Sequence, residues 1–258
     1  MSADGMKWRV LPGVRKDDGA TCMAIDRALL TSVSEGRSPP TIRVYRWSRE
    51  TVSFARGRIM RPLVETGVDL AQRPSGGKAL YHHPDDLTYC IVAPLKDFLE
   101  SYAGVSRIDL AKLYSTCLGW QVSALRRMSI DARIADEKGD PSDACLLDRS
   151  TPHNDVLVEG KKVSGNAVDT WKGAFMLHGS VFYDPDPERI AMVYAGLGIR
   201  KNPREIDGSI TGIRRWSSVS SDDAIGILLE SLKEGKECDE SDLSSYESYL
   251  VKSALILK

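Results

Sequence analysis

Two glycines stand between a serine and a lysine in the segment RPSGGKALYHHPDDLTYC, residues 73–90. Paired glycines allow the backbone to come close to a ligand, and their N–H groups can bind an oxyanion. Arg73 and Lys78 would add positive charge to such a site. The spacing matches neither the phosphate-binding pattern G-x-x-x-x-G-K-[ST] nor the dinucleotide-binding pattern G-x-G-x-x-G. Taken alone, the segment fits a Gly-Gly hairpin turn better than a ligand loop.

A pair of lysines follows a predicted turn in NDVLVEGKKVSGNA, residues 154–167. A two-residue turn at Glu159 and Gly160 would carry Lys161 and Lys162 into the next strand. Alternation along that strand sends the two side chains to opposite faces, so one lysine can face a cleft. A lysine in a cleft could stabilise the negative charge of a phosphate or of an acyl-transfer transition state. The alternative is a pair of solvated lysines on a hairpin.

The four histidines do not follow a metal-binding pattern. His82, His83 and His153 are too irregularly spaced to predict a zinc site. His178 lies in the apolar stretch FMLHGSVFY, where a histidine is more often a hydrogen-bonded core residue than a ligand. The histidines therefore predict no metal site.

The cysteines are odd in number and form no CxxC pair, so neither a disulfide framework nor a structural zinc site is expected. The five are Cys22, Cys90, Cys117, Cys145 and Cys238. A small buried apolar residue is the simplest interpretation, and it suits Cys90 and Cys117. Cys145 lies in the polar segment GDPSDACLLDRSTPHND and stays open as a nucleophile.

The composition is that of an ordinary globular protein. Among 258 residues, 35 are basic and 36 acidic, which gives a net charge of -1 and does not indicate nucleic-acid binding. No apolar run is long enough to span a membrane, so no membrane partner is expected. The N-terminus MSADGMKWRV lacks the pattern of a signal peptide, and a cytoplasmic location is therefore expected.

The elements that must position these residues follow from apolar periodicity. Strands are expected at residues 8–12, 39–47, 50–57, 87–94, 155–168 (as a hairpin) and 173–184. Helices are expected at residues 21–36, 106–128, 187–198, 221–235 and 241–257. The helix at 106–128 should open with a capping box formed by Ser106 and Asp109. Residues 63–72 are predicted to form a short helix or turn, and residues 200–220 to be basic and irregular. Strands that alternate with single helices, some in hairpins, predict an α+β (mixed α/β) fold.

Three motifs in this order resemble the lipoate–protein ligase and octanoyltransferase family. They are RPSGGKALYHHPDDLTY, NDVLVEGKKVSGNA and LHGSVFYDPD. The stretches DGATCMAIDRALL and PPTIRVYRWSRETVSFARG are similar to the first helix and strands of the family, so the resemblance covers roughly residues 8–220. It implies a central mixed or antiparallel sheet with flanking helices, as in the catalytic domain of biotin and lipoate ligases. It also implies one catalytic domain over residues 1–258, with C-terminal helices in 221–258 and no separate accessory domain.

The resemblance implies a role for individual residues. Lys162 would be the catalytic lysine that contacts the reacting carbonyl and phosphate. The substrate or adenylate site would comprise Arg73, Ser75, Gly76, Gly77, Lys78, Ala79, Tyr81, His82, Asn154, Asp155, Gly165, Ala167 and His178. Enzymes of this family attach lipoate or octanoate to one lysine of a lipoyl carrier protein, either a lipoyl domain or a protein like the glycine-cleavage H protein.

Two subclasses of the family must be separated. A lipoate–protein ligase uses ATP with Mg²⁺ bound through the phosphates, and forms a lipoyl-adenylate near Asn154 and Asp155. An octanoyltransferase takes octanoate from acyl carrier protein through a cysteine thioester, here at Cys145. NDVLVEGKKVSGNA is ligase-like, whereas Lys78 stands where ligases carry a third glycine, which favours the transferase. The ligase, with or without a separate accessory subunit, is the first expectation, and the octanoyltransferase is the alternative.

A non-catalytic lipoyl-carrier binding protein is a hypothesis of another class. Loss of the lysine or of the Gly-Gly loop would favour it, and both are present, so it ranks below the enzymes. A biotin ligase is disfavoured because its GRGRxG-type loop is absent, with FARGRIM only a partial match.

Overall fold

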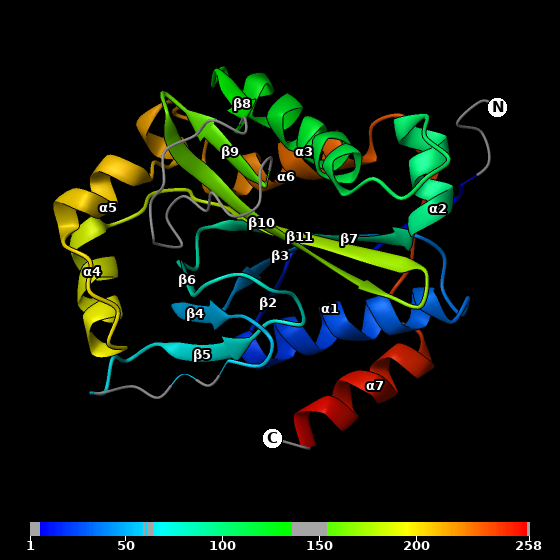
Figure 1. Ribbon diagram of the computed structural model, residues 1–258, viewed down its shortest axis with the longest axis horizontal. Helices are drawn as coiled ribbons and strands as arrows, with labels where there is room; N and C mark the ends of the chain where they lie inside the picture. Colours follow the sequence, from blue (N-terminus) through cyan, green and yellow to red (C-terminus); the bar gives the residue numbers. More distant parts are fainter. Residues whose placement is uncertain (1–5, 59, 61–63, 136–153, 257–258) are drawn as a thin grey trace.

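The computed structural model of the protein describes residues 6–58, 60, 64–135 and 154–256 (Figure 1). Its centre is a nine-stranded sheet with the order β12-β1-β3-β7-β11-β10-β9-β8, and β2 pairs with β3 beside this path. The strands are β1 (Trp8–Val10), β2 (Arg15–Asp17), β3 (Thr41–Trp47), β7 (Leu87–Pro94), β8 (Ala132–Ile134), β9 (Asp155–Val158), β10 (Lys161–Trp171), β11 (Ala174–Val181) and β12 (Cys238–Glu240). Along the path β3-β7-β11-β10-β9-β8 every neighbouring pair is antiparallel. Strands β1, β2 and β12 pair in parallel, so the sheet is mixed as expected.

A second sheet of three strands lies beside the first (Figure 1). It has the order β5-β4-β6, with β4 (Thr51–Phe54) between β5 (Asp69–Gln72) and β6 (Leu80–His82). The short helix or turn predicted for residues 63–72 is therefore wrong over β5. Local pattern could not reveal this strand, because its partner β4 pairs with it in parallel after a connection of more than a dozen residues.

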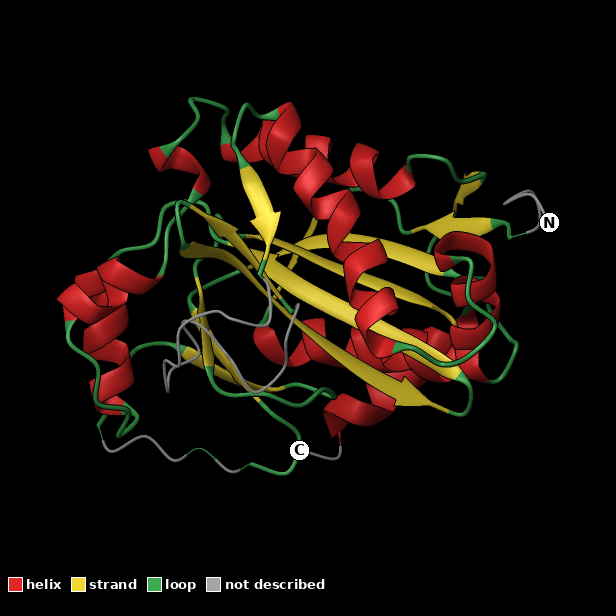
Figure 2. Ribbon diagram, turned by 45° about the horizontal axis from the view of Figure 1, so that its top comes forward, coloured by secondary structure: helices red, strands yellow, loops and turns green. Residues whose placement is uncertain are grey.

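Helices cover both faces of the large sheet, and Figure 2 shows its long strands passing between them. The helices are α1 (Gly19–Ser34), α2 (Leu95–Phe98), the π-helix η1 (Leu99–Ala103), α3 (Leu110–Arg127), α4 (Pro187–Gly196), α5 (Pro203–Ser209), the 3₁₀ turn η2 (Ile213–Arg215), α6 (Ser221–Lys233) and α7 (Ser245–Ile256). One core cluster packs α3 and α6 against one face, and a second packs α1 and α7 against the other. A third cluster packs α4 and α5 against the small sheet. This arrangement confirms the predicted mixed α/β fold.

Two helix starts differ from the sequence prediction. The predicted capping box at Ser106 is wrong, because the side chain of Asp109 is itself the N-cap and accepts a hydrogen bond from the Lys112 N–H. Residues 200–220 are not irregular throughout, because α5 begins with a capping box formed by Asn202 and Glu205. The glutamate follows the capping residue by three positions, which is the usual spacing, so this helix start could have been predicted from the sequence.

The predicted hairpin of β9 and β10 is confirmed. Its two turn residues, Glu159 and Gly160, have φ angles of 49° and 76°. Positive φ at both positions is the type I′ geometry that matches the twist of the flanking strands. The turn therefore fixes which residues of β10 face inward, and with them the placement of the lysine pair.

Candidate functional site

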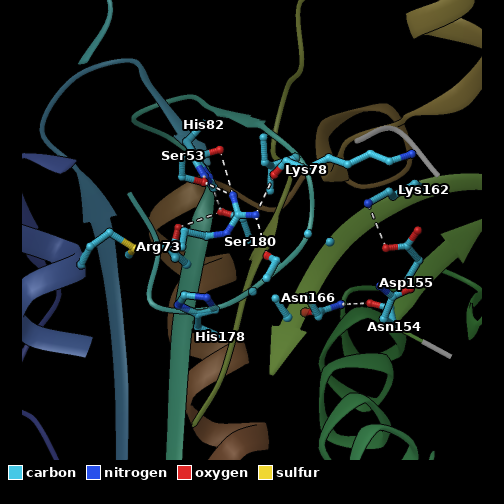
Figure 3. Close-up of a pocket in the computed structure, with 18 of the residues that line it drawn as sticks. Ser53, Arg73, Lys78, His82, Asn154, Asp155, Lys162, Asn166, His178 and Ser180 are labelled. Atoms are coloured by element: carbon cyan, nitrogen blue, oxygen red, sulfur yellow. Dashed lines mark hydrogen bonds and ion pairs between the residues drawn. The ribbon is translucent and has the colours of Figure 1, made fainter. Parts of the chain in front are cut away.

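A cavity lies where the β9–β11 end of the large sheet meets the small sheet and the loop after Gln72 (Figure 3). It contains about 600 Å³ of empty space, part of it open to solvent. Its lining residues are Met23, Tyr45, Trp47, Ser53, Arg73, Gly76, Gly77, Lys78, Leu80, His82, Thr88, Asn154, Asp155, Lys162, Gly165, Asn166, Ala167, His178, Gly179 and Ser180. The three sequence motifs thus converge on one cavity, although 105 residues separate Arg73 from His178.

The two lysines of β10 face opposite ways, as strand alternation predicted. Lys161 turns outward to the carbonyl and carboxylate of Asp207. Lys162 is buried in the cavity, and its Nζ lies 2.9 Å from Oδ1 of Asp155 on the neighbouring strand. The side chain of Lys162 lies across Gly165, since a Cβ at that glycine would come 2.9 Å from Cε and 3.0 Å from Nζ. The alternative prediction, that both lysines are solvated, is therefore wrong for Lys162.

Arg73 holds the Gly-Gly loop by its backbone. One guanidinium nitrogen, Nη2, donates to the carbonyl oxygens of Gly76 at 3.0 Å and Lys78 at 2.7 Å. The other, Nη1, donates to the carbonyl and hydroxyl oxygens of Ser53, each at 2.8 Å. Gly77 has a φ of 99°, which residues with a Cβ rarely adopt. The loop is thus a fixed backbone turn that lines the cavity.

Both ring nitrogens of His178 lie at hydrogen-bond distance from a buried side chain. Its Nδ1 lies 3.0 Å from Oδ2 of Asp26 on α1, and its Nε2 lies 2.7 Å from the hydroxyl of Ser75. Arg43 also binds Asp26 at 2.6 Å, and the Tyr45 hydroxyl donates to it at 3.0 Å. Burial raises the pKa of Asp26, but Arg43 and His178 outweigh it, so the pKa lies below its ordinary value. Asp26 is therefore a buried carboxylate with three partners.

His82 occupies the wall formed by the small sheet. Its Nε2 lies 2.6 Å from the Ser53 hydroxyl and its Nδ1 3.1 Å from the Ser180 hydroxyl, and its ring stacks on Trp47 at 4.3 Å between centroids. Burial, with smaller contributions from Arg73 and His178, lowers the pKa of His82 well below its usual value. His82 is therefore a neutral imidazole at physiological pH.

Asn166 closes the inner wall beside β11. Its amide nitrogen donates to the carbonyl of Asn154 at 2.9 Å, and its oxygen accepts from the Tyr89 hydroxyl at 2.7 Å. A Cβ at Gly179 would lie 1.9 Å from Oδ1 of Asn166, so only glycine leaves room for this side chain. Asn166, Asn154 and Gly179 therefore form one packed unit of the wall.

The structure brings most of the predicted site residues to the cavity. Those that line it are Arg73, Gly76, Gly77, Lys78, His82, Asn154, Asp155, Lys162, Gly165, Ala167 and His178. Ser75 and Ala79 are buried behind the lining, and the Tyr81 hydroxyl turns away to the carboxylate of Glu50. Cys145 and His153 lie outside the described residues.

Several lining residues were missed by sequence reasoning. Tyr45 and Trp47 are two positions apart on β3, and His178 and Ser180 are two apart on β11, so each pair shares a face. Extending the alternation from His178 would have found Ser180. Asp26 does not line the cavity but binds His178, and sequence reasoning missed it too. Its signal was an acidic residue within the apolar helix stretch CMAIDRALL.

The cysteines of the described segments do not line this cavity. Cys22, Cys90 and Cys117 are buried, and Cys238 is half-buried. Burial raises the pKa of Cys22 to about 12 and the pKa of Cys90 well above its ordinary value. Neither thiol is a nucleophile in this environment, since the thiolate is the reactive form.

The described part of the chain contains neither a metal-binding cluster of side chains nor a membrane-spanning helix. No group of three or more His, Cys, Asp or Glu side chains is placed there to hold a metal ion. No helix among these residues has both the length and the apolar character needed to cross a membrane.

Comparison with known proteins places the chain in a family. A model of the lipoyl protein ligase A/B catalytic domain matches residues 18–233. The octanoyltransferase LipM of Kyrpidia tusciae is 34% identical over 201 residues, which are 72% of this chain and 69% of that protein. The octanoyltransferase LipM of Geobacillus kaustophilus is 28% identical over 186 residues, which are 67% of this chain and 64% of that protein.

Solved structures show the same fold. A crystal structure of lipoate-protein ligase A bound with ATP superimposes with a TM-score of 0.76 and 22% sequence identity, covering 98% of this chain and 96% of that one. The family model spans most of the chain, and the Kyrpidia relative covers more than two thirds of it. The chain therefore belongs to the lipoyl protein ligase A/B catalytic domain family.

Proposed function

We propose that this protein is an octanoyltransferase, which moves an octanoyl group from an acyl carrier thioester to one lysine of a lipoyl carrier protein. The observation that carries the proposal is the 34% identity to a curated relative named as an octanoyltransferase. Lys78 supports the same choice, because the family resemblance places the third glycine that is typical of the ligases at its position. The chain's single catalytic domain would include α6, β12 and α7.

In the first step a cysteine thiolate attacks the thioester carbonyl. A new C–S bond forms to the enzyme, the donor C–S bond breaks, and the carrier leaves as its thiolate, which takes up a proton from solvent. The nucleophile assigned from the sequence is Cys145. None of the described cysteines lines the cavity, and three of the four are buried, which supports this assignment.

In the second step the amine of the acceptor lysine attacks the acyl-enzyme. The amide C–N bond forms, the C–S bond breaks, and the cysteine thiolate is regenerated as the amine loses its proton. Negative charge develops on the carbonyl oxygen in both steps. The ammonium of Lys162, held by Asp155, is positioned in the cavity to stabilise that charge.

The ATP-dependent ligase was the first expectation from the sequence, and the curated relatives favour the transferase over it. The ATP-bound ligase structure supports only the fold here, at 22% identity. In a ligase, ATP and Mg²⁺ would be co-substrates near Asn154 and Asp155. Asp155 is paired with Lys162 in the structure, so a magnesium ion would compete for the carboxylate.

The experiment measures the intact mass of a lipoyl domain after incubation with this protein. One tube holds octanoyl-acyl carrier protein without ATP, and the other holds lipoate, ATP and Mg²⁺. The proposal expects a mass gain of one octanoyl group in the first tube that disappears in Cys145→Ala. A gain only with ATP that survives Cys145→Ala would instead identify a ligase, and no gain in either tube would favour a non-catalytic binding protein.

A further inference from the structure

A buried chain of hydrogen bonds runs from helix α1 to the Gly-Gly loop. It passes from the carboxylate of Asp26 through the imidazole of His178 to the hydroxyl of Ser75, at 3.0 and 2.7 Å. The exposed fractions of the three residues are 0%, 4% and 0%. Ser75 directly precedes Gly76 and Gly77, so the chain ends at the backbone that lines the cavity.

The charge state of Asp26 sets the direction of its bond to His178. The carboxylate can only accept, so Nδ1 of His178 carries a proton and donates it. The other ring nitrogen, Nε2, lies 2.7 Å from the Ser75 hydroxyl, so the imidazole links the carboxylate of Asp26 to Ser75. Because Ser75 is fully buried and its hydroxyl is hydrogen-bonded to His178, that hydroxyl holds the loop rather than the substrate.

The opposite side of the loop is also fixed. Arg73 binds the carbonyl oxygens of Gly76 and Lys78, and the carbonyl of Ser75 accepts from the Arg56 N–H at 3.0 Å. Two glycines without side chains cannot anchor themselves by packing. Their position therefore depends on Arg73 on one side and on the Asp26–His178–Ser75 chain on the other.

We propose that Asp26 is a positioning residue that fixes the Gly76–Gly77 backbone through His178 and Ser75. The inference rests on the proposed function, since the fixed backbone serves acyl transfer at the cavity. Groups that stabilise a transition state must be held to within about 0.5 Å, and a 1 Å error can cost about 100-fold in rate. Loss of the chain should therefore lower kcat more than it changes KM for the acyl donor.

The first test is Ser75→Ala, which removes the last hydroxyl of the chain and adds no bulk. The expected result in the ATP-free transfer assay is a fall in kcat of about 10- to 100-fold, with KM for octanoyl-acyl carrier protein changed less than about 3-fold. The matched control is Ser231→Ala. Ser231 is equally buried, its hydroxyl accepts from Arg127 at 3.2 Å, and it does not line the cavity, so activity should be unchanged.

The second test uses NMR and does not depend on activity. In the wild type, the Nδ1 proton of His178 should resonate far downfield because it is donated to a carboxylate, and Asp26→Asn should remove that signal. Backbone order parameters of Gly76 and Gly77 should fall in Ser75→Ala from about 0.85 to below about 0.6. Asp26→Asn leaves Arg43 without its carboxylate. If that variant does not fold, the kcat and the order parameters of Ser75→Ala test the inference on their own.

Wild-type kcat and unchanged order parameters in Ser75→Ala would overturn the inference. An equal loss of kcat in Ser231→Ala would also overturn it, since the effect would then be general. A wild type that transfers no octanoate without ATP would contradict the proposed function instead. The order parameters would still decide whether Asp26, His178 and Ser75 fix the loop.

Discussion

The ammonium of Lys162 lies 2.9 Å from the carboxylate of Asp155, and both side chains are buried at the wall of the cavity. A buried ion pair contributes little net stability, because desolvation of the charges offsets their attraction. The function of the pair here is to hold one cation at a fixed place in the cavity wall. The proposed acyl transfer needs such a cation where the carbonyl oxygen becomes negative.

Replacing Lys162 by alanine should lower kcat/KM for octanoyl transfer by about 100- to 1,000-fold, since one stabilising donor is lost from the transition state. The adjacent Lys161 is the matched control, because its side chain turns outward to Asp207. Lys161→Ala should stay within about 3-fold of the wild type. Equal losses in the two variants would contradict the assigned role of Lys162. Circular dichroism checks that both variants are folded.

Gly165→Ala should displace the catalytic lysine without unfolding the protein. The added Cβ would meet Cε and Nζ at the flexible end of Lys162, which can move away. We expect kcat to fall by about 10- to 100-fold, because a displaced group stabilises the transition state poorly. Gly119→Ala is the control on the exposed side of α3, where open space surrounds the Cβ. It should keep full activity and add up to about 1 kcal/mol of stability. Unchanged kcat in Gly165→Ala would show that the position of Lys162 is not limiting.

His82 makes stability depend on pH. Its pKa is lowered well below 6.5 in the folded protein, mainly by burial, whereas the unfolded chain takes up a proton near pH 6.5. Below that pH the unfolded state binds more protons, so the free energy of unfolding falls as pH falls, by about 1.4 kcal/mol per pH unit. His82→Gln should remove this part of the slope between pH 6.5 and 5, measured by urea unfolding. An unchanged slope in His82→Gln would mean that His82 is not a buried neutral imidazole.

The C-terminal helix α7 depends on a buried ion pair with β1. The two guanidinium nitrogens Nη1 and Nη2 of Arg9 bind the two oxygens of Glu247 at 2.9 and 2.6 Å. Glu247→Gln would leave Arg9 buried without its carboxylate and should lower the free energy of unfolding by about 3–5 kcal/mol. Glu230→Gln, which breaks an exposed pair with Lys233, should cost less than about 1 kcal/mol. Similar losses in the two variants would contradict the role of the buried pair.

Local signals in the sequence predicted the elements that they control. The turn at Glu159 and Gly160 specified the hairpin and therefore the opposite faces of Lys161 and Lys162. Strand β5 and the three-residue strand β12 gave no such signal. β5 pairs in parallel with β4 across a long connection, and β12 pairs in parallel with β1 near the other end of the chain, so tertiary contacts decide their conformation.

The candidate site was predictable where motifs marked it and not where side chains meet across elements. The Gly-Gly loop and Lys162 were singled out by their residue types, and the family resemblance then assigned them to the site. The link from Asp26 through His178 to Ser75 joins residues 152 and 103 positions apart, so no local spacing could predict it. The hydrogen bonds from Arg73 to backbone carbonyls could not be predicted either. Every residue has a backbone carbonyl, so the sequence does not show which of them accept.

The most direct test of the central claim is the intact mass of this protein after incubation with octanoyl-acyl carrier protein alone. We predict an acyl-enzyme heavier by one octanoyl group, mapped by peptide mass spectrometry to Cys145, absent in Cys145→Ala and discharged when a lipoyl domain is added. A lipoyl domain that is modified only with ATP, while the enzyme never carries an acyl group, would contradict the octanoyltransferase assignment.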